Sequence, residues 1–428
     1  MHDIKFIIEN PGLIKRGAKR KGAHTDIDKI VELYEKRNEK LSRLESLRAR
    51  QNEVSKLIPK AEKDEKEKLL DEMSKVKDET KTLEPEIAAI EIELDQLAIQ
   101  VPNPPLDSTP DGTEADNKPC KTHGEKPKFD FTPKDHITLG KDLDIIDIER
   151  GTRASGTRFY YLKNEAALLE FALLQHVIHK LTSKGFSPVI PPVLVKEEAM
   201  FATGFFPADR NEIYHVNPKS EENPENDDLF LVGTSEVPLT MLHYTEILDT
   251  EKLPIRYCGF SSCFRREAGS YGKDTAGIIR VHQFDKIEMF SFCHPDKSEE
   301  EHEFIRSIEE EIMQELGFHY QVVDICAGDL GAPAAKKYDI EVWIPTQEKF
   351  RELTSCSNCT DFQSRRSRIR YKTAKGNEYI HTLNGTAVAI ARTLVAILEN
   401  YQNSDGSVTI PAVLQPYMGG RTKISPKN

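Results

Sequence analysis

Two long amphipathic stretches in the first hundred residues constrain the fold more than any other feature of this chain. Between residues 73 and 97, mainly apolar side chains recur at alternating spacings of three and four, which is the seam of a coiled coil. A second helical stripe lies between residues 30 and 58, and a polar stretch that opens with Pro59 separates the two. The sequence therefore predicts an antiparallel coiled-coil hairpin with about 30 residues, or about 45 Å, in each helix, and Pro85 should kink the second helix. The stripe residues are Ile30, Tyr34, Leu41, Leu44, Leu47, Val54 and Ile58, then Met73, Val76, Thr80, Leu83, Ile87, Ile90, Leu94 and Leu97.

The composition excludes several classes of protein. A chain of 428 residues is expected to fold into two or three domains. Its net charge of −12 argues against a protein that coats nucleic acid non-specifically, so a nucleic-acid partner would have to meet a local basic surface. No apolar run reaches the roughly 18–20 residues of a membrane span, and the seven cysteines do not resemble a disulfide framework. We therefore expect a soluble protein of a reducing compartment, the cytoplasm.

Three segments follow one another along the chain. Residues 1–100 form the predicted arm, and residues 101–135, which are rich in proline, glycine and polar side chains, are typical of a linker. Residues 136–428 alternate helical and strand patterns, with a long helix expected at about 165–184 and a last helix at about 386–401. The fold class is therefore α+β, a helical hairpin followed by a domain built on a largely antiparallel sheet. The expected strands include LFLVG (229–233), IRYCGFSSCF (255–264), IIRVHQFDKIEMFSF (278–292), YQVVDI (320–325) and DIEVWIP (339–345).

Charged side chains alternate with apolar ones on two neighbouring predicted strands. In the strand that starts at residue 280, Val281, Ile287 and Met289 can face a core, whereas the even positions carry charge and an aromatic ring. The preceding strand places Arg265 and Glu267 on one face, and the loop AGSYGKDTAG joins the two strands. Such a face cannot be a dry core, because an unpaired buried charge costs several kcal/mol or more. The even positions are Arg280, His282, Phe284, Lys286 and Glu288.

This charged face has two interpretations. It fits a polyanionic ligand with an aromatic ring, because guanidinium groups bind phosphates and Phe284 can stack on a base. It also fits a solvated sheet face with cross-strand salt bridges. Arg392 favours the ligand, because it is the single charge in the apolar stretch 384–398, a predicted helix preceded by Asn384 and Gly385 as turn and cap residues. We expect the strand pair and Arg392 to form one cradle for the phosphates of a nucleotide.

Three segments resemble the signature motifs of class II aminoacyl-tRNA synthetases. The first motif is matched by GFSPVIPPVL, the second by FRREAGSYGKDTAGIIRVHQFDKIEMF, and the third by TLNGTAVAIARTLVAILENYQ. Several short sequence segments resemble those of seryl-tRNA synthetases of bacterial or organellar type. They are VGTSEVPL, REAGSYG, VHQF, RELTSCSNCTDFQSRR and ILENYQ. This resemblance covers essentially the whole chain, the N-terminal arm included.

The resemblance implies an antiparallel sheet flanked by helices and a homodimer that attaches serine to tRNA(Ser), and also to tRNA(Sec) where one is present. Serine would first react with ATP, bound with Mg²⁺, to give seryl-adenylate. The implied ATP site comprises Arg265, Arg266, Glu267, Arg280, Val281, Phe284, Glu352, Leu353, Thr354, Ser355 and Arg392. The implied serine site comprises Thr234, Ser235, Glu236, Arg265, Glu288, Asn384 and Thr386.

The resemblance also implies a role for individual residues at this site. The catalytic residues would be Arg265 on the α-phosphate, Glu267 near the adenine amine and Arg392 on the terminal phosphate. Phe284 would stack on the adenine, and Glu352 would hold ATP through Mg²⁺. The segment 234–236 would receive the ammonium group of serine. The serine hydroxyl would be read by Glu288 and Thr386.

The arm and the cysteines each keep an alternative. A coiled coil usually serves dimerisation, whereas the resemblance implies that the arm grips the long variable arm of tRNA(Ser), across the dimer. Cys356 and Cys359 have the C-x-x-C spacing of a zinc site. This segment is part of the sequence that resembles the seryl-tRNA synthetase family, so no zinc is expected. A non-catalytic RNA-binding relative and a ligase that charges a carrier protein remain competing functions. The arm cations expected to meet phosphates are Lys36, Arg37, Lys40, Arg43, Arg48 and Arg50.

Overall fold

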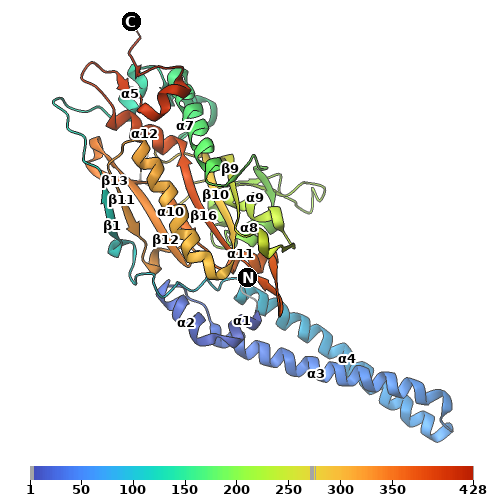
Figure 1. The fold of residues 1–428 in the computed structure, drawn as a ribbon. Helices are drawn as coiled ribbons and strands as arrows, with labels where there is room; N and C mark the ends of the chain where they lie inside the picture. The colour runs from blue at the N-terminus through green and yellow to red at the C-terminus, as the bar shows by residue number, and fades with distance from the viewer. Residues whose placement is uncertain (1–3, 270–273, 275, 428) are drawn as a thin grey trace. The chain divides into compact units, whose positions relative to one another are not determined.

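A computed structural model describes residues 4–269, 274 and 276–427 of the chain. The chain divides into two compact units, Met1–Pro104 and Pro105–Asn428 (Figure 1). Among the described residues, no helix is long and apolar enough to cross a membrane.

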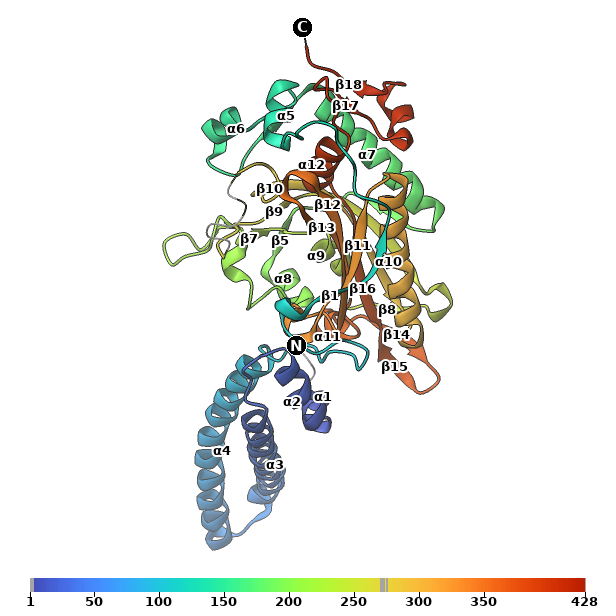
Figure 2. The same ribbon diagram turned by 90° about the vertical axis from the view of Figure 1, so that its left-hand side faces the viewer.

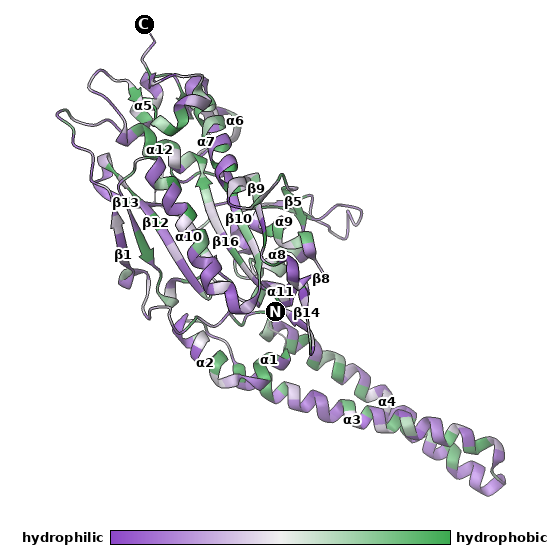
Figure 3. Ribbon diagram, viewed as in Figure 1, coloured by the Kyte–Doolittle hydropathy of each residue, from purple (hydrophilic) through white to green (hydrophobic). Residues whose placement is uncertain are grey.

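The first unit contains the predicted hairpin. Helices α3 (Ile27–Leu57) and α4 (Lys63–Ala98) are joined by a short 3₁₀ turn, Ile58–Lys60, and the side chain of Asp26 caps α3 by accepting from the backbone N–H of Lys29 at 2.9 Å. In Figure 3 both helices are mainly hydrophilic, with hydrophobic residues at intervals. Stripe residues from both helices are buried, which confirms the predicted pairing. The buried stripe residues are Ile30, Leu44, Leu47 and Val54 on α3 and Val76, Ile87, Ile90 and Leu94 on α4.

Two features of this unit go beyond the sequence prediction. Helices α1 (Ile4–Glu9) and α2 (Pro11–Arg20) precede the hairpin, and Ile7 and Ile14 join the core at its base. Helix α4 continues through Pro85 without interruption. Pro85 and the residue four positions before it are both exposed, so water can satisfy the carbonyl that loses its helical partner.

Most of the arm cations that were expected to bind phosphate are paired with acidic residues. Five of the six cations expected to bind phosphate form ion pairs between α3 and α4, at 2.6 to 2.8 Å. Exposed pairs of this kind contribute little to stability and can exchange partners. The pairs are Arg37–Glu91, Lys40–Glu86, Arg43–Glu79, Arg48–Glu84 and Arg50–Glu72.

The second unit is built on an eight-stranded sheet with the order β1-β11-β12-β13-β16-β10-β9-β4 (Figure 2). Every neighbouring pair in it is antiparallel except β4 and β9, which agrees with the predicted fold class. The strands are β1 (Lys118–His123), β4 (Ser187–Val189), β9 (Ile255–Phe264), β10 (Gln283–Cys293), β11 (Tyr320–Asp324), β12 (Lys336–Ile344), β13 (Lys349–Asn358) and β16 (His381–Ala389).

Helices α7 (Asn164–Ser183), α10 (Ser298–Glu315) and α12 (Ile390–Asn400) contribute to the main hydrophobic core of this unit. Ile287 and Met289 of β10 are fully buried in that core, as their odd positions predict. The remaining helices are α5 (His136–Asp142), α6 (Ile148–Ser155), α8 (Glu197–Thr203), α9 (Glu236–Thr240) and α11 (Phe362–Ser367). The remaining strands are β2 (Ile146–Asp147), β3 (Tyr161–Leu162), β5 (Leu194–Lys196), β6 (His215–Val216), β7 (Leu229–Leu231), β8 (Ile247–Leu248), β14 (Arg370–Thr373), β15 (Gly376–Tyr379), β17 (Val408–Thr409) and β18 (Lys423–Ile424).

The third predicted motif is a strand followed by a helix, not one helix from residue 386. Asn384 and Gly385, expected to precede a helix, lie inside β16, and α12 begins at Ile390. Because β16 pairs on both sides and is buried on both faces, its apolar run does not alternate and resembles a buried helix. A Cβ at position 385 would lie 2.4 Å from Ile305 Cγ2, so glycine allows α10 to pack closely on the strand.

Two other segments differ from the prediction. The expected linker, 101–135, contains β1, which forms an edge of the sheet by pairing with β11. All six residues of β1 are exposed, so no periodicity marked it. The charged strand is shorter than expected, because β9 ends at Phe264 and β10 begins at Gln283. Residues 265, 267, 280 and 282 therefore lie beyond the strand ends, and their face cannot be read from strand parity. Part of the joining loop, 270–273 and 275, lies outside the described residues.

Candidate active site

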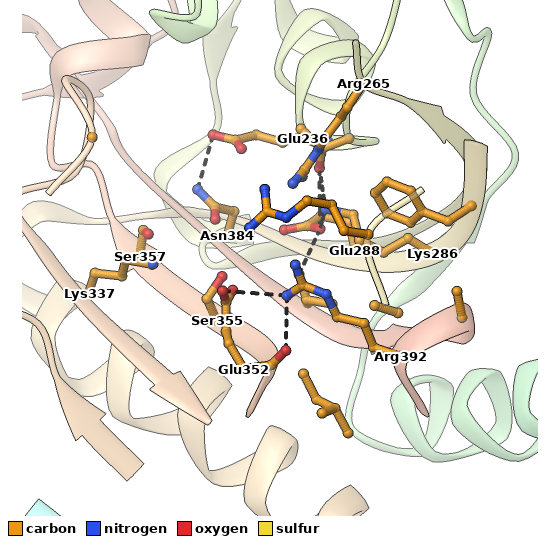
Figure 4. Close-up of a pocket in the computed structure, with 18 of the residues that line it drawn as sticks. Glu236, Arg265, Lys286, Glu288, Lys337, Glu352, Ser355, Ser357, Asn384 and Arg392 are labelled. Atoms are coloured by element: carbon orange, nitrogen blue, oxygen red, sulfur yellow. Dashed lines mark hydrogen bonds and ion pairs between the residues drawn. The ribbon is translucent and has the colours of Figure 1, made fainter. Parts of the chain in front are cut away.

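Residues of β10, β13 and β16 line a cavity of about 400 Å³ (Figure 4). Gly385 and Thr354 of these strands face α10, so the cavity lies on the opposite side. Its walls combine both expected charged groups, the residues around the β9–β10 connection and the arginine of α12. Five cationic and four acidic side chains line it, so an anionic ligand would meet a nearly balanced set of charges. Predicted residues at this cavity are Thr234, Glu236, Arg265, Glu267, Arg280, Val281, Phe284, Glu288, Glu352, Leu353, Ser355, Asn384, Thr386 and Arg392.

Three predicted residues do not line the cavity. Ser235 is buried against Ser261, with their Oγ atoms 2.7 Å apart. Thr354 points toward α10, where its Oγ1 donates to Glu309 at 3.4 Å. The third is Arg266.

A bulge explains how β13 presents its site residues. The pairing of β12 with β13 shifts by one residue between positions 340 and 341, opposite Leu353. Such a shift reverses the alternation of the strand. Glu352 can therefore line the same cavity as Ser355 and Ser357, although their positions differ in parity.

The carboxylate of Glu288 lies in a group of buried polar side chains. Its Oε2 accepts from the hydroxyls of Thr234 and Thr386, both at 3.3 Å, and lies 2.5 Å from Nζ of Lys286. Nζ of Lys286 also donates to Oγ1 of Thr234 at 2.7 Å. All four side chains are buried, so a small hydroxyl-bearing ligand would meet them with little competition from water.

Glu236, the first residue of α9, lies close to this group. Its Oε1 accepts from Nε2 of Gln363 at 2.6 Å and from Nδ2 of Asn384 at 3.0 Å. Burial raises the pKa of Glu236 to about 7, and the negative charge of Glu288 adds to this increase. A ligand with an ammonium group would supply the positive charge that favours the ionised form of Glu236.

The arginine after β9 lies next to an aromatic ring. Nε and Nη2 of Arg265 donate to the carbonyl of Gly233 at 3.3 and 3.2 Å, and its guanidinium lies 5.3 Å from the ring centre of Phe284. Nη1 of Arg280 donates to Glu267 at 2.6 Å. This wall therefore offers guanidinium groups for phosphates and a ring on which a base can stack.

Arg392 of α12 contacts β13 and the segment that precedes β10. It donates to the carbonyl of Glu352 at 2.9 Å and to that of Ile279 at 3.3 Å, and its Nη1 is 3.4 Å from a carboxylate oxygen of Glu352. Burial alone would raise the pKa of Glu352, but the positive charges of Arg392, Lys337 and Arg265 lower it to about 2. The side chain of Arg392 is 25 % exposed and that of Glu352 is 40 % exposed, so both remain accessible to a ligand.

The structure also brings residues to the cavity that the predicted site omits. The sequence pattern could have identified Lys286 as a site residue, because its even position places it on the same strand face as Glu288. No sequence pattern could have identified Phe205, Lys337 and Ser357, because they come from segments that only the fold brings together. Cys359 also lines the cavity, and all seven cysteines are free thiols. The absence of zinc stays a prediction.

Comparison with known proteins identifies the class to which this fold and cavity belong. Residues 214–401 match the tRNA synthetase class II core domain (G, H, P, S and T). The class is therefore that of the class II aminoacyl-tRNA synthetases. Residues 1–105 match the seryl-tRNA synthetase N-terminal domain.

Individual relatives narrow the family. A serine–tRNA ligase of Dictyoglomus thermophilum is 48 % identical over 433 residues, covering 100 % of both chains. The crystal structure of seryl-tRNA synthetase from Pyrococcus horikoshii complexed with ATP superposes with a TM-score of 0.92 at 39 % identity, over 100 % of both chains. The cytoplasmic serine–tRNA ligase of Naegleria fowleri in complex with AMP gives a TM-score of 0.87 at 35 % identity, over 100 % of this chain and 99 % of the other. The chain belongs to the seryl-tRNA synthetase family.

Proposed function

We propose that this protein attaches L-serine to tRNA(Ser) in two steps. The serine carboxylate attacks the α-phosphorus of ATP, pyrophosphate leaves, and seryl-adenylate remains. A ribose hydroxyl at the 3′ end of the tRNA then attacks the seryl carbonyl, and AMP leaves. The observation that carries this proposal is one cavity in which buried acceptors, Glu236 and Glu288, lie together with the guanidinium groups of Arg265 and Arg392.

The serine end of the cavity supplies selectivity by hydrogen bonding. Glu236 would receive the ammonium group and Glu288 the hydroxyl. Alanine would leave the buried carboxylate of Glu288 without its ligand partner, and an unsatisfied buried acceptor is strongly unfavourable. The added methyl group of threonine must be excluded by the shape of the pocket, to which the methyl group of Thr386 contributes.

The nucleotide end supplies positioning and charge. Arg265 would bind the α-phosphate and Arg392 the terminal phosphate. Phe284 would stack on the adenine, and the carboxylate of Glu267 would accept a hydrogen bond from the adenine amine. Attack of one anion on another needs neutralisation of charge and alignment more than a covalent enzyme intermediate. These roles follow from the family resemblance and fit the positions of the side chains.

The titration of Glu236 predicts how serine use depends on pH. Only the ionised carboxylate pairs with an ammonium group, and burial raises the pKa of Glu236 to about 7. In serine-dependent exchange of pyrophosphate into ATP, kcat/KM for serine should rise about tenfold per pH unit below pH 7 and level off above it. Glu236→Gln should raise KM for serine and remove this pH dependence of kcat/KM. An equal rise of kcat/KM with pH in the variant would contradict the role of Glu236 as acceptor of the ammonium group.

A divalent metal ion, for which we propose Mg²⁺, would accompany ATP. Glu352 and Ser355 offer oxygen ligands at the cavity, and the low pKa of Glu352 keeps its carboxylate ionised across the working range. Such an ion would neutralise phosphate charge during adenylate formation. In the part of the chain that the structure describes, no three His, Cys, Asp or Glu side chains could hold a metal together, so the phosphates would complete its coordination.

Replacing the proposed metal ligand should change the metal requirement. Glu352→Gln should raise the half-saturating Mg²⁺ concentration in pyrophosphate exchange at least about tenfold, because one anionic ligand is lost. KM for serine should change far less. A titration that coincides with the wild type would remove Glu352 from the metal site.

The arm would bind the long variable arm of tRNA(Ser). Five of the six arm cations expected to bind phosphate pair with glutamates in the structure. RNA phosphates would therefore replace these carboxylates as partners of the arm cations. Because the pairs are exposed, this exchange would cost little.

We also propose a homodimer that works in the cytoplasm. Large apolar side chains are exposed on α7 and beside β4, where Phe171 is 60 % and Ile190 is 86 % exposed. Light scattering should give twice the 48.6 kDa of one chain, and Phe171→Glu should shift the protein toward monomer. Leu70→Glu, at an equally apolar but arm-located position that is 50 % exposed, should not. The Naegleria fowleri relative is described as cytoplasmic, which supports the location.

Charging assays test the function as a whole. With ATP and Mg²⁺, the protein should transfer labelled serine to transcripts of tRNA(Ser) and of tRNA(Sec), but not labelled alanine or threonine. Serine-dependent exchange without transfer to tRNA would favour a ligase for a carrier protein. No exchange at all would favour a non-catalytic RNA-binding relative.

A further inference from the structure

We propose that Lys286 is a positioning residue that sets the specificity of the cavity for serine. Its ammonium group holds one oxygen of the Glu288 carboxylate, so that the other oxygen is presented to the substrate hydroxyl as a charged acceptor. This inference rests on the proposed function and adds a residue that touches Glu288, not the reacting atoms.

The contacts of Lys286 are short and buried. Nζ lies 2.5 Å from Oε2 of Glu288 and donates to Oγ1 of Thr234 at 2.7 Å. Lys286 is 5 % exposed and Glu288 is 2 % exposed, so water screens this pair very little. A lysine carries three donors on a flexible stem, and burying it is unfavourable unless it is paired. The pairing therefore defines where both side chains stay.

The hydrogen bonds to the Glu288 carboxylate and its shortest ion-pair contact end on the same oxygen. Oε2 receives Lys286, Thr234 and Thr386, at 2.5, 3.3 and 3.3 Å. Among the described residues, no side-chain hydrogen bond ends on Oε1, and Glu288 lines the cavity. A carboxylate accepts on both oxygens, so Oε1 remains for a ligand. Thr386, expected to read the serine hydroxyl directly, would instead help to orient Glu288.

The charge of Lys286 is as important as its position. The buried acids Glu288 and Glu236 lie close enough that the charge of Glu288 raises the pKa of Glu236, whereas Lys286 lowers it. Without the lysine, two acids would share a buried site with no ammonium group between them, and one would take up a proton. A neutral acid binds a hydroxyl less strongly than a carboxylate does, because hydrogen bonds to charged groups are about twice as strong. The preference for serine over alanine would fall accordingly.

Lys286→Met tests this inference, because it keeps the length of the side chain and removes its charge. In pyrophosphate exchange, we expect KM for serine to rise about 100-fold and the serine-to-alanine ratio of kcat/KM to fall at least about tenfold, with KM for ATP within about threefold of the wild type. The pH midpoint of kcat/KM for serine should move upward by at least about one unit, because a higher pH is needed to ionise both acids. Lys297→Met, at an exposed lysine of the same unit, is the matched control and should change none of these.

Several outcomes separate a positioning role from a structural one. A Lys286→Met variant that loses serine and ATP use by the same factor, with the wild-type discrimination and pH profile, would overturn the inference. If this variant does not fold, Lys286→Arg decides, because it keeps the charge but displaces Glu288. It should lower the serine-to-alanine ratio without moving the pH midpoint, and an unchanged ratio would overturn the inference. A wild type without serine-dependent exchange would contradict the proposed function itself, which is a different result.

Discussion

Replacing Arg265 by glutamine should lower kcat/KM for serine-dependent pyrophosphate exchange by about 10³-fold, or roughly 4 kcal/mol in the free energy of activation. The guanidinium group lies 5.3 Å from the ring centre of Phe284 and lines the same cavity as Glu288, and in the proposed function it binds the α-phosphate that the serine carboxylate attacks. Two anions meet there, and glutamine can donate a hydrogen bond but cannot offset their charge. The loss should therefore appear mainly in kcat, because the developing charge is greatest in the transition state.

Arg266 provides the matched control for this change. It is the next residue on the same segment and was predicted at the ATP site, but it does not line the cavity, and its backbone N–H donates to Glu212 at 2.8 Å. Arg266→Gln should keep kcat/KM for exchange within about tenfold of the wild type. Equal losses in both variants would mean that the two arginines act together and that the cavity does not distinguish them.

Shortening the arm should separate the two steps of the reaction. Removing residues 41–57 and 63–85 while keeping the turn at 58–62 would bring the ion pair between Lys40 and Glu86 to the new end of the hairpin. Since the arm belongs to a different compact unit from the cavity, serine-dependent exchange should stay within about twofold of the wild type. Transfer to tRNA(Ser) should lose about 100-fold or more in kcat/KM, because several phosphate contacts disappear together.

The salt dependence of transfer gives a second measure of the arm. Phosphate contacts release counterions, so KM for tRNA in the full-length protein should increase steeply with salt, and the shortened protein should show a smaller slope. A shortened protein that charges tRNA(Ser) as well as the full chain would assign the arm to another task, such as dimerisation. Loss of exchange together with transfer would indicate damage to the catalytic unit.

The sequence predicted the parts of this fold that have a clear period. The seam from Val76 to Leu94 defined the hairpin, and the alternation of Lys286 and Glu288 with Ile287 and Met289 placed two site residues on one face of β10. Periodicity failed at β16, which is buried on both faces, and at β1, which is exposed throughout. Neither strand presents two different environments to its alternate residues, so neither leaves a pattern in the sequence.

The candidate site shows a similar division. Arg265 and Glu267 line the cavity as predicted, but for a different reason, because they follow β9 rather than belonging to it, and Glu267 has φ of 50°. The bulge in β13 allows Glu352 to line the cavity and turns Thr354 away from it. No local sequence pattern predicts this bulge. Lys337 reaches the cavity only because β12 pairs with β13. Partners distant in sequence are set by the pairing of strands, and a single sequence does not report that pairing.

A crystal structure with a non-hydrolysable analogue of seryl-adenylate would test the site most directly. We expect its phosphate-like group against the guanidinium of Arg265, its adenine on Phe284, and its seryl hydroxyl within hydrogen-bonding distance of Oε1 of Glu288. An analogue bound elsewhere on the protein, or bound in this cavity with its seryl group pointing away from Glu236 and Glu288, would contradict the proposed site.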